Sequence, residues 1–218
     1  MPHCFSRPVA VLLGLLLLSG CKSVEKAVFH TIRSNKSVAV GKLPRLESMV
    51  EPGPLMATDG ASPDDASKVF RQELAYHFAE PQPDTVQYGY ARLTIVQADV
   101  KRTGRALQAF QLLTLMTPSL VGVPLEWYRT TLAAEVQIIN SQGDVIATYT
   151  GIGHSKVRVA MYHGYGQLQA ARLADVQALR LALDQIRPQL EADADTLRQK
   201  LATSGPIEGI VSRPLGVN

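Results

Sequence analysis

The histidines are the first residues in this chain that could carry out chemistry. His154 and His163 flank a strand-like segment, and folding could bring both near Glu135, which would give an acid–base or metal-dependent hydrolase. Helical zinc sites need a second ligand at i+3 or i+4, and counting forward from the histidines of the mature chain only His77 and Glu80 have that spacing. We therefore predict no catalytic residue and no bound metal, and keep the hydrolase as an alternative.

The glycine-rich stretch Gly151–Lys156 (GIGHSK) follows a second strand-like segment. A dinucleotide site would need a third glycine and then a helix, and a phosphate-binding loop would need Gly-Lys-Ser or Gly-Lys-Thr. The next residues, Val157-Arg158-Val159, are instead typical of a strand. We predict no nucleotide cofactor here, and we interpret the glycines as a bulge or bend followed by an extension of the strand or by a fifth strand.

The segment Tyr162–Gly166 (YHGYG) combines two tyrosines with two glycines. Glycines let a backbone approach a ligand closely, and tyrosines supply flat contact area with one polar end. Tyr162 and Tyr165 are therefore candidate partner-binding residues. The alternative is a turn that directs the chain into the next helix.

The segment Ala106–Leu125 has no charged residue and contains two prolines and a glycine. It is long and apolar for a connection between strands, whereas exposed loops are usually short and polar. It either folds over an open end of the core or presents an apolar surface to a partner or lipid. For the second case Leu115, Leu120 and Val123 are the candidate contact residues.

The N-terminus places Arg7 before the apolar run Val9–Leu18, which ends in Leu18-Ser19-Gly20-Cys21. A basic residue, a short apolar run and small residues are typical of a secretory signal peptide. The last four residues resemble the lipobox of bacterial lipoproteins. That resemblance implies that residues 1–20 are removed and that Cys21 becomes the lipidated first residue, with this lipid as the one covalent group.

The resemblance also implies a location. In the enterobacterial sorting pattern an aspartate after the cysteine retains a lipoprotein in the inner membrane, and this chain has Lys22 there. We expect the periplasmic face of the outer membrane, with exposure at the cell surface as the alternative. Residues 21–36 would form the tether, either lying on anionic headgroups through its basic residues or fully solvated.

Composition excludes some function classes. The formal net charge is +3, and removal of Arg7 leaves 21 basic against 19 acidic residues, so nucleic acid is not a predicted partner. The two cysteines are Cys4 and Cys21, of which the first would be removed and the second acylated. A protein exported without a disulfide must be stabilised by its apolar core alone.

The first half of the mature chain predicts a short strand at Ser37–Val40 and then an exposed loop over Gly41–Gly60. A helix is predicted over Pro63–Ala79, with Ser62 as its N-cap and proline at its first position. The spacing of Val69, Phe70, Leu74 and Phe78 marks its buried face.

The second half predicts strands at Tyr90–Val100, Thr130–Ile139 and Val145–Thr150, the last two joined as a hairpin by turn-forming residues. A helix is predicted over Gln167–Leu201, with Leu183 and Ile186 among the residues that face the sheet. Pro188 lacks an amide hydrogen, so we expect a kink or break near Arg187.

These elements predict an α+β fold in the order β-α-β-β-β-α. It has an antiparallel sheet of about four or five strands with two main helices on one face. Residues 37–203 would form a single periplasmic domain and residues 204–218 a flexible or docked tail. The element order resembles small periplasmic lipoproteins, including the lipopolysaccharide-assembly lipoprotein. We therefore predict a non-enzymatic accessory or assembly factor of an envelope complex with an envelope protein partner; the alternative is a small lipid or glycan carrier.

Overall fold

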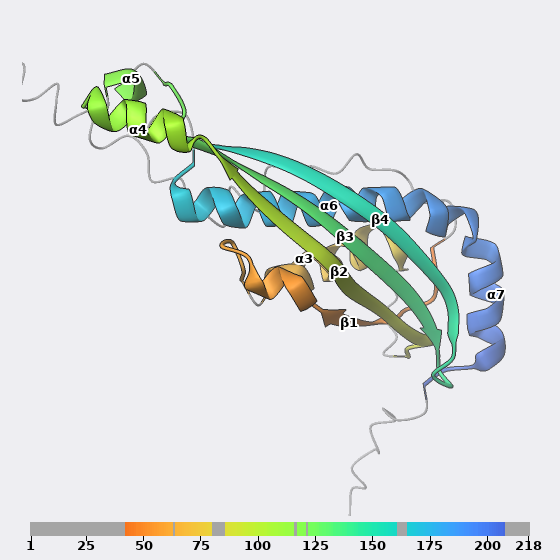
Figure 1. Cartoon of the computed structure of the whole chain (residues 1–218). Coiled ribbons are helices and arrows are strands. Elements are labelled where there is room, and N and C mark those ends of the chain that lie inside the picture. The colour runs from red at the N-terminus through yellow and green to blue at the C-terminus, as the bar shows by residue number, and fades with distance from the viewer. Residues whose placement is uncertain are drawn as a thin grey trace, which may run out of the picture. The chain divides into compact units, whose positions relative to one another are not determined.

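A four-stranded sheet is the centre of the computed structural model, which describes residues 42–62, 64–79, 86–115, 117–120, 122–160 and 165–207. Cys21, the signal peptide, the tether and the predicted strand Ser37–Val40 lie outside these residues. The strands are β1 (Glu47–Glu51), β2 (Gly89–Thr103), β3 (Glu126–Asn140) and β4 (Val145–Val159), and they lie in that order across the sheet (Figure 1). With its two main helices on one face, the domain confirms the predicted α+β class.

The edge strand β1 corrects two predictions. It lies within the stretch expected to be an exposed loop, followed by a short 3-10 helix over Gly53–Ala57. It also runs parallel to β2, whereas the other neighbouring strands are antiparallel as predicted. A helix joins β1 to β2, and such a crossover returns the chain in the same direction. The apolar signal within β1 is weak because the strand gains its stability from pairing at a sheet edge.

The first helix is confirmed, with a different start. Helix α3 spans Asp65–Glu73 and continues as a π-helical segment, Leu74–Phe78. Its N-cap is Asp64 and not Ser62, whose carbonyl accepts a hydrogen bond from the amide of Asp65 at 3.1 Å. The predicted apolar face is buried: Val69, Phe70, Leu74 and Phe78.

Strand β4 runs through the glycines without interruption, so the predicted bulge or bend there is wrong, and the continuation of the strand is the correct alternative. Its pairing with β3 is regular from Ala147 to Val159. Gly151 and Gly153 instead let a helix approach: a Cβ on either residue would overlap the backbone oxygen of Ala182 or Ala178. Both glycines serve close packing of helix and sheet.

The predicted C-terminal helix is two helices, α6 (Gln167–Ala192) and α7 (Ala194–Ser204). The break lies at Asp193 and not near Arg187, because α6 continues through its proline. The hydroxyl of Tyr149 donates to Asp193 at 3.0 Å. Beyond that residue α7 changes direction and runs along the hairpin end of the sheet (Figure 1), where it buries Leu197 and Leu201.

The core lies between the sheet and helices α3 and α6. Leu183 and Ile186 of α6 are fully buried, which confirms that this face of the helix packs on the sheet. Bidentate hydrogen bonds from Arg172 of α6 to Asp65 tie the two helices together at 2.5 and 2.7 Å. None of the described helices is long and apolar enough to cross a membrane.

Candidate functional site

The uncharged segment folds as a small helical unit at the end of the sheet opposite α7. It contains α4 (Arg105–Leu113) and α5 (Thr117–Leu120) and connects β2 to β3. We call residues 105–124 the tip; Figure 1 shows it projecting beyond the strand ends. Gly104, at φ +126°, lets the chain leave β2 and enter α4, because L residues rarely adopt that backbone conformation.

The buried side chains in the described part of the tip are polar. Gln111 is 0% exposed, and its side-chain amide donates to the carbonyls of Pro124 at 3.0 Å and Val123 at 3.4 Å. The buried hydroxyl of Ser119 donates to the Gln111 side-chain oxygen. Thr114 caps the end of α4 by donating to the carbonyl of Phe110 at 2.9 Å. Hydrogen bonds thus hold the described side chains of the tip in place.

The exterior of the tip is apolar. Leu113 and Leu115 are 85% and 89% exposed, and Leu112 and Phe110 are also exposed. Leu115 has φ +49°, a conformation that costs a non-glycine residue roughly 1–2 kcal/mol. The leucine at this position is therefore neither buried nor favoured by the backbone.

The predicted contact residues are placed differently from one another. Leu115 lies on the exposed side of the tip, and Val123 is half-buried beside the Gln111 amide. The side chain of Leu120 and all of Tyr162 lie outside the described part of the structure. Tyr165 lies at the base of the tip, just before α6. The structure therefore brings Tyr165 near the segment that contains Leu115.

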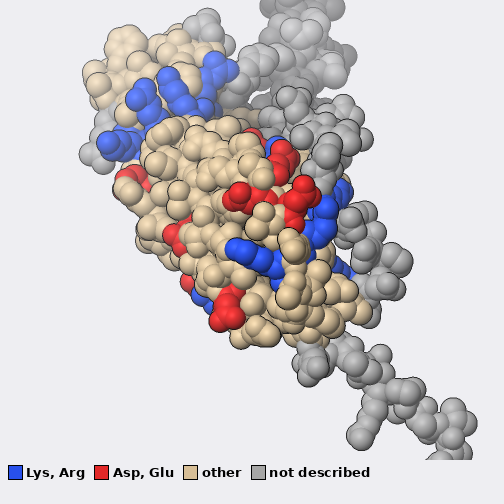
Figure 2. All heavy atoms as spheres, turned by 90° about the vertical axis from the view of Figure 1, so that its right-hand side faces the viewer, with Lys and Arg blue, Asp and Glu red and all other residues tan. Residues whose placement is uncertain are grey.

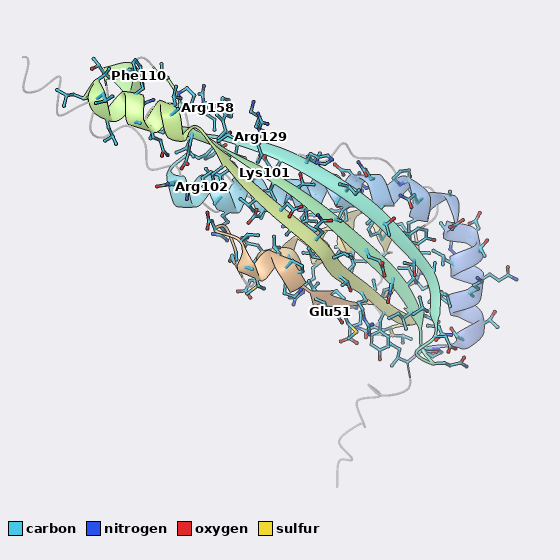
Figure 3. All side chains as sticks on the ribbon, in the orientation of Figure 1. Glu51, Lys101, Arg102, Phe110, Arg129 and Arg158 are labelled. Carbon is cyan, nitrogen blue, oxygen red and sulfur yellow. The ribbon has the colours of Figure 1, made fainter. Side chains whose placement is uncertain are left out.

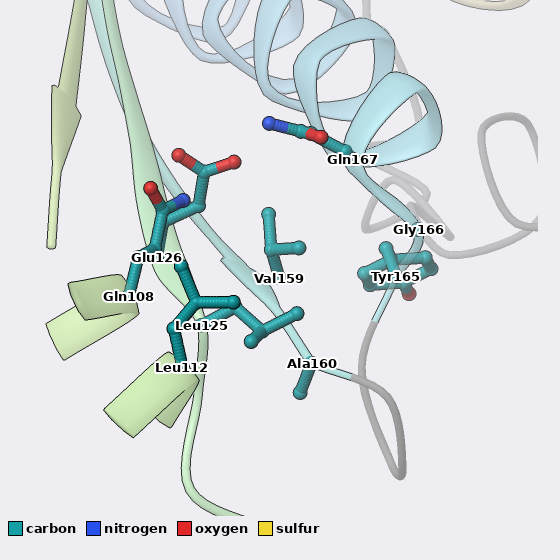
Figure 4. A pocket seen from close by; sticks show the side chains of 9 residues that line it. All are labelled: Gln108, Leu112, Leu125, Glu126, Val159, Ala160, Tyr165, Gly166 and Gln167. Carbon is teal, nitrogen blue, oxygen red and sulfur yellow. The ribbon is translucent and has the colours of Figure 1, made fainter. Parts of the chain in front are cut away.

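A pocket of about 390 Å³ separates the base of the tip from the start of α6 (Figure 4). Its apolar lining consists of Leu112, Leu125, Val159, Ala160 and Tyr165. Polar side chains at its rim are those of Gln108, Glu126 and Gln167. A few polar groups around a mainly apolar wall are typical of small-molecule sites.

One carboxylate at this pocket is already neutralised. Glu126 is buried and accepts hydrogen bonds from the Arg102 guanidinium at 3.1 to 3.3 Å. Burial by itself lowers the pKa of Arg102, but its hydrogen bond with Glu126 and the charge of that carboxylate raise the pKa above its ordinary value. The guanidinium also lies over the Tyr128 ring, 5.2 Å from its centroid. The pair links the ends of β2 and β3.

Basic residues line the opposite face of the sheet at the same end. Lys101, Arg129 and Lys156 are direct neighbours across β2, β3 and β4. One row nearer the tip, Trp127 is paired with Arg158, and the Lys156 ammonium lies 4.2 Å from the centroid of the Trp127 ring. We call Lys101, Arg129, Lys156 and Arg158 the basic row. Figure 3 labels three of these residues, along the strand ends from which the tip continues.

The sequence interpretation missed the basic row. Two pairs of residues in the sequence are spaced two apart: Trp127 with Arg129, and Lys156 with Arg158. This spacing places the members of each pair on the same face of a strand. That signal was present in the sequence, but the cross-strand register is needed to bring the two pairs together.

The hydrolase candidates do not meet among the described residues. His154 pairs with Thr131 and lies within 3.1 Å of its hydroxyl, whereas Glu135 pairs with Thr150. Glu135 and Thr131 are four residues apart on β3, which separates the two positions by about 13 Å along the strand. His163 lies outside the described residues. Over the described ranges, no group of three or more potential metal ligands is found.

Comparisons with known proteins leave the assignment to the sequence and the geometry. No family model matches the chain, and no curated protein matches it.

Proposed function

We propose that this chain is a lipid-anchored accessory protein of the bacterial outer membrane that works by binding and not by catalysis. The lipobox-like sequence ending in Cys21 supports the anchor. The tip supports the binding role: its polar side chains are paired inside, while Phe110, Leu113 and Leu115 are turned outward. That arrangement is the single observation on which the proposal depends, because exposed contiguous apolar surface is typical of an interaction site.

The anchor is tested by replacing its cysteine. Cys21→Ser should accumulate as the full-length precursor and incorporate no labelled palmitate, while the wild-type chain is shortened and labelled. Labelling and normal processing of the variant would contradict the proposed lipid anchor.

The docking role is tested by photocrosslinking in intact cells. A photoreactive residue at Leu113 should give a specific adduct, to a protein or to lipid, that is absent when the same residue replaces Leu181. Leu181 is an exposed leucine of α6 and therefore a matched control. Equal crosslinking from both positions, or none from either, would contradict docking through the tip.

The pocket favours a second candidate, a carrier for a small lipid or glycan. Its volume of about 390 Å³ is at the lower end of the range for ligand sites, roughly 300–1,000 Å³. Native mass spectrometry of the purified protein would show a bound small molecule that is lost when Ala160, in the wall of the pocket, is replaced by Phe. Identical spectra for the two proteins would exclude this candidate.

A further inference from the structure

We infer that the tip and the basic row together form one surface that docks on an anionic lipid bilayer. This inference rests on the proposed docking role of the tip and names what the tip binds. Its elements are the outward apolar side chains Phe110, Leu113 and Leu115, and behind them the four cations of the basic row.

The basic row is unfavourable for the isolated fold. Like charges directly opposite each other on neighbouring strands destabilise a sheet, and here Lys101, Arg129 and Lys156 lie in one such line. Among the described residues, the ion pairs do not include any of these three. The nearby acid on this face is Asp99, which accepts a hydrogen bond from Gln97 at 2.6 Å. A line of cations without partner carboxylates is complementary to an anionic surface.

Arg102, on the same strand as Lys101, differs from it because a carboxylate neutralises its charge. It lies on the other face of β2, where Glu126 neutralises it at 3.1 Å and Asp59 lies at 3.7 Å. Its neighbour Lys101 is exposed. Lys101, Arg129 and Lys156 therefore lie on the face of the strand ends opposite the Arg102–Glu126 pair, and Figure 2 shows Lys and Arg gathered beside the tip.

The order of side chains fits a bilayer interface. From the tip toward the sheet, the apolar side chains come first, and the indole of Trp127 and the cations of the basic row follow at the strand ends. Successive rows of a strand face are about 7 Å apart, so the leucines would enter the acyl boundary while the cations remain among the phosphates. Tryptophan is enriched at that depth, because its ring is apolar and its N–H is polar.

The shape of the surface also favours a bilayer over a folded protein. A stable protein interface buries about 800 Å² on each partner with close complementarity. The tip instead presents outward leucines on a short helical unit that projects past the strand ends (Figure 3), which a fluid bilayer accommodates without a matching cavity. The following experiment distinguishes a bilayer from a protein partner.

The experiment uses the mature chain, residues 21–218, carrying Cys21→Ser so that no acyl chain contributes. The buried apolar residues of the described part lie between Leu43 and Leu201, so this change is outside that core. Trp127 is the single tryptophan of the chain and reports its own environment. Vesicles of phosphatidylcholine alone are compared with vesicles containing about one third phosphatidylglycerol, with brominated lipids as the quencher.

This chain, without further substitutions, should sediment with anionic vesicles and show quenched Trp127 fluorescence. With neutral vesicles both the sedimented fraction and the quenching should be small. Each basic side chain near an anionic surface strengthens binding roughly fivefold, so Arg129→Gln with Lys156→Gln should weaken it about 25-fold. Lys68→Gln with Lys200→Gln makes the same change in charge at exposed positions on α3 and α7, away from the tip, and should leave binding within about twofold. Leu113→Ser should reduce quenching, and Leu181→Ser should not.

Three results would overturn the inference: equal binding to neutral vesicles, no loss in the Arg129 and Lys156 variant, or an equal loss in its control. The two proposals fail separately. If vesicle binding is absent while Leu113 still crosslinks to one protein in cells, the bilayer is the wrong partner and docking through the tip stands. If Leu113 gives no specific crosslink in cells, neither to a protein nor to lipid, docking through the tip itself is wrong.

Discussion

The body of the domain and the tip distribute their side chains in opposite ways. On the inner face of α6, Leu183 and Ile186 are fully buried against the sheet. In the tip, Gln111 is fully buried and hydrogen-bonded, while Leu113 and Leu115 face outward. Removal of apolar surface from water stabilises the body, whereas the tip keeps its apolar surface exposed. The comparison assigns stability to the body and is the basis for the recognition role that we propose for the tip.

The largest effect is expected in the body. Leu183→Ala should lower the free energy of unfolding by about 2–5 kcal/mol, because it removes buried methyl groups and leaves a cavity. Urea denaturation measures the change. Leu181→Ala, two residues earlier and exposed, is the control and should cost less than about 0.5 kcal/mol. Similar values for both variants would remove the basis for treating the body as an apolar core.

The tip should respond to loss of a polar side chain. Gln111→Ala leaves two carbonyls and the Ser119 hydroxyl without their partner, at a cost of about 1–3 kcal/mol. The loss should appear as faster hydrogen exchange in α4, with little change in the melting temperature, because the tip lies outside the core between sheet and α6. Gln108→Ala on the same helix should change exchange much less. A global loss of stability would mean that the tip is part of the core.

Asp175 of α6 is one of the buried polar residues of the body. It is buried and accepts hydrogen bonds from Thr58 at 2.6 Å and Thr130 at 2.8 Å. Burial raises the pKa of its carboxyl above the ordinary value of 3.8, although both hydrogen bonds lower it. The folded state therefore holds this proton more tightly than the unfolded state, so its contribution to stability declines as the pH rises from about 3.8 through the raised pKa.

Asp175→Asn should remove that dependence. The difference in unfolding free energy, wild type minus variant, should become smaller with rising pH across this window, as measured by urea denaturation at several pH values. Parallel stability curves for the two proteins would show that Asp175 titrates alike in the folded and unfolded states. A slope of opposite sign would mean that the threonine hydrogen bonds outweigh burial.

The regular elements were predictable because each carries its own local pattern. Alternating apolar residues in β2 and β3, and the turn formers between Asn140 and Asp144, predict the strands and the hairpin without reference to the rest of the chain. The edge strand β1 was not predictable in this way, because its stability depends on pairing with β2. The break at Asp193 depends on contact with Tyr149, which is distant in sequence.

The basic row was not predictable because two β-bulges set it. The β3–β4 register shifts between Ile138 and Ile139, so that Arg129 lies opposite Lys156. Without that shift Arg129 would face Ser155, and Lys156 would point to the buried side of the sheet. A second shift, between Ile95 and Gln97, puts Lys101 on the same face. A one-residue insertion leaves almost no trace in the hydrophobic pattern.

The tip was identified from its lack of charge, but its inside-out arrangement was not. Composition alone is compatible with leucines that cover the core and with leucines that face solvent. The deciding contacts are those of the Gln111 amide with the carbonyls of Val123 and Pro124, more than ten residues later in the chain. Such hydrogen bonds follow from the fold of the loop and have no periodic signature.

The smallest effect separates stability from recognition at one residue. Leu115 has φ +49° and is 89% exposed, so its side chain contributes little burial. In Leu115→Gly, relief of the left-handed strain is worth about 1–2 kcal/mol, and the greater backbone freedom of glycine in the unfolded chain offsets about 0.4–1 kcal/mol of it. Local stability of the tip should therefore stay level or rise by up to about 1.6 kcal/mol.

Binding should change in the opposite direction, because the same substitution removes an outward apolar side chain. Hydrogen exchange in α4 measures the first effect, and sedimentation with anionic vesicles measures the second. Leu113→Ala, within α4, removes a similar outward side chain without relieving strain and should weaken binding with no gain in protection. Reduced protection in Leu115→Gly would show that Leu115 packs against the tip, and its loss of binding would then report unfolding and not recognition.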